Sequence, residues 1–176
     1  MTKLLSFALA LAVSVPVYAQ KMGSSNRNAP KIEQTIMAGD ATMSLNYTSI
    51  TWADGQMMQR LADKETGARA RQMVNDSAPN APLASFETNV DVMCGKLHLP
   101  AGEYKVFYTI DDDTNWHINF MAGDKTHEMK LPLSPVKNEY KRLVMPIYAE
   151  DGGCGLYIAF GTQSCMLSMK AHKKGD

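Results

Sequence analysis

Apolar and polar residues alternate along most of the stretch from Phe86 to Phe120. Successive side chains of a β-strand point to opposite faces, so a strand with one buried face repeats with a period of two residues. Turn residues divide the stretch at Cys94-Gly95, at Pro100-Ala101-Gly102 and at the acidic run from Asp111 to Asn115. Glycine tolerates the backbone angles of tight turns, and proline cannot donate to a neighbouring strand. The pattern therefore predicts an antiparallel meander with one apolar face.

Similar alternation marks further short strands on both sides of this stretch. They are predicted at Met43 to Tyr47, Ser49 to Trp52, His127 to Leu131 and Tyr140 to Tyr148, and a final hairpin pairs Leu156 to Phe160 with Cys165 to Met169 around Gly161 to Ser164. Short strands separated by turn signals at regular intervals are typical of sandwiches and jelly rolls. We therefore expect an all-β fold, an antiparallel β-sandwich or jelly-roll-like domain.

The segment from Gln56 to Asn75 has a different period. Its apolar residues, Met57, Met58 and Leu61 among them, recur at helical spacing, and Gly67 interrupts the pattern. One or two short amphipathic helices packed on the sheet are predicted here. The arginines of this segment suggest either an anion-binding edge or a solvated helix face; they are Arg60, Arg69 and Arg71.

The run Leu99-Pro100-Ala101-Gly102-Glu103-Tyr104 joins two predicted strands, and Trp116-His117-Ile118 follows the next polar turn. In this order the residues resemble the bacterial family catalogued as domain of unknown function 2911 (DUF2911). Where many members carry an arginine- and glycine-rich segment with a Trp-Arg pair, this chain has the turn-rich run from Asp76 to Ala84, so the resemblance is to a divergent member. It implies a secreted or periplasmic all-β domain with no established activity.

The first residues have the features of a secretory signal peptide. Lys3 precedes an apolar run, and Val17-Tyr18-Ala19 places small or branched residues before a cleavage point after Ala19. The run is shorter than the ~20 residues that a membrane-spanning helix needs. No cysteine follows the cleavage point, which argues against a lipoprotein anchor. We expect a periplasmic or secreted protein without a transmembrane segment after cleavage.

Composition then suggests how the rest of the chain is organised. Residues 20–34 are rich in Gly, Ser, Asn and Arg and are predicted to form a flexible leader, 35–172 a single domain, and 173–176 a frayed basic tail. Removing 19 of the 176 residues leaves 157, enough for one core. The mature chain has 17 basic and 18 acidic residues, and this balance argues against a nucleic-acid partner.

Three cysteines leave one unpaired if a disulfide forms. Export permits disulfides, and Cys154 and Cys165, which flank the last predicted hairpin, are the candidate pair. A turn at Thr162-Gln163 would instead place Phe160 opposite Cys165, so the pairing needs a bulge or a different register. Otherwise Cys94 bridges to either partner, or all three remain free. The chain has no Cys-x-x-Cys motif to indicate redox chemistry.

A metal site would have to be assembled from distant residues. The histidines of the domain, His98, His117 and His127, lack paired ligand spacing and converge only if the fold brings them together, with Glu128 or an aspartate of the turn as a further ligand. That arrangement would indicate a metal-binding protein or a metal-dependent hydrolase. Asp111-x-Asp113-x-Asn115 resembles the opening of a calcium loop, but Trp116 and Ala122 replace the required glycine and glutamate.

Motifs for other catalytic chemistry are missing from the sequence. It has neither a nucleophile-elbow serine nor a phosphate-binding glycine loop, and we expect no cofactor. The carboxylates Glu87, Asp91 and Glu103 would serve a glycosidase only at a separation of roughly 5 to 9 Å. The sequence therefore favours a non-enzymatic binding or structural module of the envelope, with an unknown small molecule or envelope protein as its partner.

Aromatic residues are the candidate walls of a ligand pocket in such a module. Four of them alternate on the apolar strand faces: Tyr104, Tyr108, Trp116 and Phe120. Others break the alternation or lie outside the central stretch, and so are candidates for exposed ligand contacts: Trp52, Phe107 and Tyr157. Trp116 is also a candidate ligand-binding residue.

Overall fold

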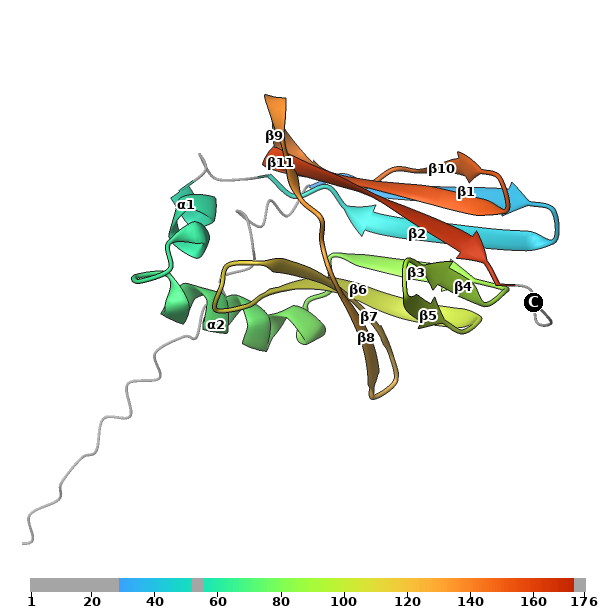
Figure 1. Ribbon diagram of the computed structural model, residues 1–176, viewed down its shortest axis with the longest axis horizontal. Coiled ribbons are helices and arrows are strands. Elements are labelled where there is room, and N and C mark those ends of the chain that lie inside the picture. Colours follow the sequence, from blue (N-terminus) through green and yellow to red (C-terminus); the bar gives the residue numbers. More distant parts are fainter. Residues whose placement is uncertain (1–28, 52–55, 173–176) are drawn as a thin grey trace, which may run out of the picture.

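The chain folds into two antiparallel sheets that pack face to face (Figure 1). The computed structural model describes residues 29–51 and 56–172. Six strands form the first sheet in the order β1-β2-β3-β6-β7-β8: β1 Lys31–Ala38, β2 Ala41–Thr48, β3 Ala84–Thr88, β6 Gly102–Ile110, β7 Trp116–Ala122 and β8 Lys125–Lys130. The second sheet has the order β10-β11-β4-β5, with β9 also paired to β11: β4 Val92–Cys94, β5 Leu97–Leu99, β9 Ser134–Val144, β10 Ile147–Glu150 and β11 Gly153–Ala171. The predicted β-sandwich is confirmed.

The core lies between the sheets and is made of the alternating apolar residues. Met43, Leu45 and Tyr47 of β2 are buried, as the period-two pattern predicted. Trp116 packs on Phe160 of the opposite sheet with ring centroids 5.0 Å apart. Fully burying one such large side chain stabilises a fold by about 1.5–3 kcal/mol, so this interface holds the two layers together.

The run from Phe86 to Val92 is not one strand, in contrast to the sequence prediction. β3 ends at Thr88 in the first sheet, and β4 begins at Val92 in the second. Between them the hydroxyl of Thr88 donates to the carbonyl of Val90 at 2.8 Å and accepts from its N–H at 3.3 Å. These local side-chain bonds replace the sheet ladder and support the bend. The predicted meander is therefore divided between both layers.

β11 doubles back on itself, as the predicted final hairpin requires. The N–H of Ala171 donates to the carbonyl of Gly152 at 2.8 Å, and Gly153 lies against the backbone of Met169 and Lys170. Figure 1 shows the two arms side by side, with β9 crossing near their bend. One arm pairs with β10 and the other with β4, so the hairpin forms the centre of the second sheet.

Several predicted boundaries differ from the structure. β1 begins at Lys31, inside the segment expected to be a leader, so the ordered domain starts before residue 35. Of the predicted strand from Ser49 to Trp52, the described residues Ser49 to Thr51 contribute only an isolated bridge between Thr51 and Arg142, and Trp52 lies outside the described residues. The predicted strand from Tyr140 to Tyr148 is divided between β9 and β10 at Met145-Pro146, since proline removes a ladder donor. The predicted signal peptide, residues 1–19, and the predicted tail, residues 173–176, lie outside the described residues.

The disulfide between Cys154 and Cys165 is not formed. All three cysteines are free and buried. Because Gly153 lies beside Met169, Cys154 meets the second arm near Met169, about 13 Å of strand from Cys165. A disulfide needs Cα atoms within about 7 Å. The register of the β11 hairpin therefore keeps this pair apart.

Two short helices cover one end of the sandwich, as predicted. α1 spans Gln56–Ala62, α2 spans Ala68–Ser77, and the three-residue 3-10 helix η1, Ala78–Asn80, follows (Figure 1). Arg71 of α2 reaches back and donates to the carbonyls of Leu61, Asp63 and Lys64. Leu61 lies in the last turn of α1, and Asp63 and Lys64 directly follow it, so Arg71 caps that helix. None of the helices in the described part of the chain is long and apolar enough to cross a membrane.

Candidate functional site

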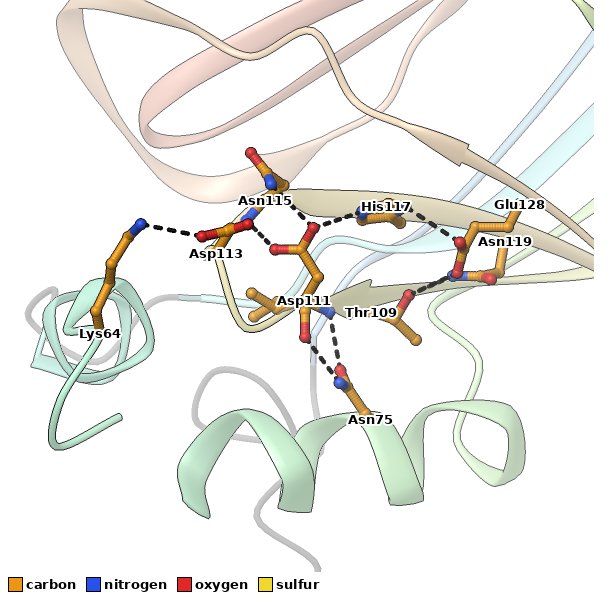
Figure 2. A network of polar contacts seen from close by, with 10 residues as sticks. Lys64, Asn75, Thr109, Asp111, Asp113, Asn115, His117, Asn119 and Glu128 are labelled. Atoms are coloured by element: carbon orange, nitrogen blue, oxygen red, sulfur yellow. Dashed lines mark hydrogen bonds and ion pairs between the residues drawn. The ribbon is translucent and has the colours of Figure 1, made fainter. Parts of the chain in front are cut away.

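The acidic turn between β6 and β7 is stabilised by its own side chains. Asp111 accepts hydrogen bonds from the backbone N–H of Asn115 at 2.8 Å and from its side-chain amide at 2.9 Å (Figure 2). Thr114 completes the turn with a left-handed φ of 66°. The side-chain hydrogen bond from Asn115 is the main cause that lowers the pKa of Asp111 to about 2. The carboxylate that resembled a calcium ligand is therefore used to form the turn.

His117, at the start of β7, lies between two carboxylates. Its Nε2 is 3.3 Å from Asp111 Oδ2, and its Nδ1 is 3.2 Å from Glu128 Oε1. Only the doubly protonated ring donates to both partners. Figure 2 shows the two carboxylates on opposite sides of the imidazole, so the ring separates them. They cannot approach one ion together with this histidine, because each ligand must come within about 2 Å of the metal.

The network continues across the outer face of the first sheet. Thr109 donates to Glu128 at 3.4 Å and accepts from the amide of Asn119 at 2.9 Å. The register pairs Thr109 with His117 and Asn119 with Glu128, so neighbouring strands bring these side chains together. Lys64, after α1, reaches Asp113 of the turn at 3.2 Å. Both of those side chains are exposed, so this ion pair contributes at most about 1 kcal/mol.

An open groove of about 610 Å³ lies between α2 and this turn. Its volume falls in the range of roughly 300–1,000 Å³ typical of small-molecule sites. Six of its lining residues come from α2, and the others come from the end of β6 and the turn: Ala68, Arg69, Arg71, Gln72, Asn75, Asp76, Ile110 and Asp112. The lining combines charges of both signs with amides and a small apolar surface. Such a groove can bind a polar molecule through several groups at once.

The structure does not assemble the predicted three-histidine site. His117 lies on the outer face of the first sheet, whereas His127, opposite Phe120 in the register, lies on its inner face beside Tyr104. His98 alternates with the buried Leu99, so it lies on the outer face of the second sheet. Burial and, to a smaller extent, the charges of Lys125 and His98 lower the pKa of His127, so His98 and His127 lie near each other, whereas His117 lies on the opposite face of the first sheet. Within the described ranges, no group of three or more His, Cys, Asp or Glu residues is arranged to hold a metal ion.

The three carboxylates considered for a glycosidase, Glu87, Asp91 and Glu103, do not come together as one group. Glu87 and Glu103 are direct neighbours in the register of β3 and β6. Asp91 instead accepts from the N–H of Ala101 at 3.0 Å and lies 3.2 Å from the ring of His98. Asp91 therefore supports the β4–β5 hairpin rather than pairing with the two glutamates.

Most of the aromatic residues that were candidates for ligand contacts are buried. Phe107 and Trp116 are only 4% and 8% exposed, so other side chains cover them. The strand aromatics Tyr104, Tyr108 and Phe120 are buried as well. Tyr157 is half-buried on the second sheet, where its hydroxyl donates to that of Tyr140 at 3.2 Å. Trp52 lies outside the described residues.

No family model, curated protein or solved structure matches this chain. Function is therefore inferred from the described residues themselves. The sequence left Arg60, Arg69 and Arg71 as either an anion-binding edge or a solvated helix face, and of these Arg69 and Arg71 line the groove. Sequence reasoning missed Asn75 and Asp112 as groove residues, because their proximity depends on how α2 docks beside the end of β6.

Proposed function

We propose that this chain is an exported β-sandwich that binds a small polar ligand, free or presented by an envelope protein, without transforming it. The groove between α2 and the β6–β7 turn is the proposed binding site. The observation that carries the proposal is the convergence of charged and amide side chains from two separate elements on this groove. Concave sites with a few convergent polar groups are the usual form of a small-molecule site.

The surroundings of the reactive side chains support binding rather than catalysis. Both ring nitrogens of His117 lie against carboxylates, and His117 is not among the residues that line the groove. Asp111, with a pKa of about 2, stays ionised at neutral pH and is poorly matched to general acid or base work. Burial raises the pKa of Cys94 to about 11, which keeps the thiol protonated and unreactive.

Export is supported by the basic residue, apolar run and cleavage signal between Lys3 and Ala19. The resemblance of the region from Phe86 to Phe120 to the domain of unknown function 2911 is in keeping with a secreted or periplasmic domain, and membership of that family stays a prediction.

Native mass spectrometry of the mature protein, purified from its secretory compartment, tests the proposed function. We expect a mass excess that disappears on denaturation, and a smaller excess in Arg69→Gln and Asp112→Asn. Lys137→Gln, which removes an exposed charge on β9 away from the groove, is the matched control. The same variants are screened by thermal shift against small polar compounds, because weakly held ligands escape purification. The proposal fails if no compound stabilises the protein, or if stabilisation is equal in groove and control variants.

A further inference from the structure

The charges of α2 are arranged against the helix dipole. Arg69 and Arg71 lie in its first two turns and Asp76 lies near its end, with no acidic residue in the first turn and no basic residue in the last. The dipole favours the opposite order, acidic at the start and basic at the end. Arg71 gains its carbonyl partners in return, but the side chain of Arg69 forms no hydrogen bond or ion pair with any described residue. A charge that opposes the helix dipole and forms no compensating contact is the kind of local exception expected at functional sites.

The basic end of the groove has an unsatisfied donor. Arg71 is only 3% exposed, and the buried Nε of its guanidinium has no hydrogen-bond partner among the described residues. The carboxylate of Asp63 interacts electrostatically with Arg71 but accepts its hydrogen bonds from the N–H groups of Glu65 and Thr66. The donor of Arg71 that has no partner is therefore its Nε, and together with the guanidinium of Arg69 and the positive end of α2 it favours an anion.

The opposite end of the groove is acidic. The side chains of Asp76 and Asp112 are exposed and form no hydrogen bond or ion pair within the described part of the chain. The other two aspartates of the turn already have partners, since Asp111 binds Asn115 and Asp113 binds Lys64. Asp112 is thus the carboxylate of the turn that is available to a cationic group of a ligand.

The spacing of the charges sets the length of the ligand. Arg69, Gln72 and Asp76 follow the spacing of residues on one helix face, and seven residues of helix separate the Cα atoms of Arg69 and Asp76 by about 10 Å along the axis. A free amino acid is too short to reach both ends. An extended peptide advances by about 3.3 Å per residue, so about three residues cover the distance. The amide of Gln72 lies between the charged ends and suits a peptide backbone, whereas the amide of Asn75 is already paired with the backbone of Ile110.

We propose that the groove binds a short zwitterionic peptide of about three residues, with its carboxylate at Arg69 and Arg71 and its ammonium group at Asp76 and Asp112. This inference rests on the proposed function, because it names the ligand class of the same groove. It also identifies charge at both ligand ends as the basis of selectivity.

Calorimetric titration of the mature protein tests the assignment with three probes: tri-alanine, its N-acetylated form and its C-terminal amide. Tri-alanine is expected to bind, and each blocked form to bind about tenfold or more weakly, because each loses a charge-assisted hydrogen bond. Asp112→Asn should weaken tri-alanine and leave the acetylated peptide unchanged. Arg69→Gln should weaken tri-alanine and leave the amide unchanged, while Lys137→Gln changes none of the affinities.

The contrary outcomes distinguish a failure of this inference alone from a failure of the proposed function as well. Equal binding of free and blocked peptides would overturn the assignment of charges. If tri-alanine fails to bind while another ligand stabilises the protein in an Arg69-dependent manner, the peptide class is wrong and the groove remains a binding site. If no ligand depends on Arg69 or Asp112, both proposals fail together.

Discussion

The side chain of Asn75 pairs with the backbone of Ile110 in both directions. Its amide donates to the carbonyl of Ile110 at 2.8 Å, and its carbonyl accepts from the N–H of Ile110 at 2.9 Å. Asn75 thereby occupies the place of a neighbouring strand at the end of β6. This contact sets the position of α2 beside the turn, and with it the width of the groove.

Replacing Asn75 with alanine should therefore cost both stability and ligand binding. Two half-buried backbone groups of Ile110 would lose their partner, at roughly 1–3 kcal/mol of the free energy of unfolding. Urea denaturation measures this loss, and hydrogen exchange in α2 shows whether the helix loosens. Gln72→Ala, on the exposed face of the same helix, should change stability by less than about 0.5 kcal/mol. Equal losses of stability in the two variants would contradict the role of Asn75.

Gly67, between α1 and α2, should tolerate no side chain. A Cβ atom there would overlap the carbonyl oxygens of Arg60 and Asp63 and press on the guanidinium of Arg71. Gly67→Ala is expected to destabilise the protein by more than about 2 kcal/mol, since backbone atoms cannot move aside easily. Gly39→Ala is the matched control, because its Cβ meets nothing within 4 Å and only its φ of 63° is strained. Thermal unfolding of both variants tests this prediction, which requires Gly67→Ala to be less stable than Gly39→Ala.

Acid should weaken the β6–β7 turn through Asp111. The folded pKa of this carboxyl, about 2, lies below the ordinary value of about 3.9 for an unfolded chain. Its contribution to stability is therefore complete above the unfolded value and is lost as the pH falls through about 4 towards 2. Urea midpoints measured across this range should fall more steeply for the wild type than for Asp111→Asn. Parallel acid profiles of the two proteins would show that the turn does not hold the carboxylate ionised.

The fold was largely predictable because the alternation of apolar and polar residues along a strand follows directly from the burial of one face. Met43, Leu45 and Tyr47 are buried where the period-two pattern places them. The change of sheet after Thr88 was not visible, since the apolar phase continues through Val90 to the next strand. A bend that keeps the same alternate residues apolar does not change the period-two pattern, so the sequence does not reveal the bend.

The candidate site was harder to predict from the sequence, for a related reason. Arg69 and Asp112 line one groove although 43 positions separate them. The link between their elements is the Asn75 side chain on the Ile110 backbone, which no local propensity indicates. Likewise, the contact of His117 with Glu128 depends on the register of β7 and β8, which the sequence does not reveal.

The cysteines should resist chemistry until the protein unfolds. Burial raises the pKa of Cys154 to about 12 and that of Cys165 to about 11, so both thiols stay protonated, and neither is accessible to a reagent. Protonated, buried thiols react slowly because the thiolate is the nucleophile. The mature protein should therefore react with a thiol reagent such as Ellman's reagent only in denaturant, then at all three positions, and its non-reduced mass should show no loss of two hydrogens. Rapid labelling of the native protein would place a thiol at the surface. A mass lower by two hydrogens would instead mean that a disulfide forms in the native protein, and would contradict the free cysteines of the structure.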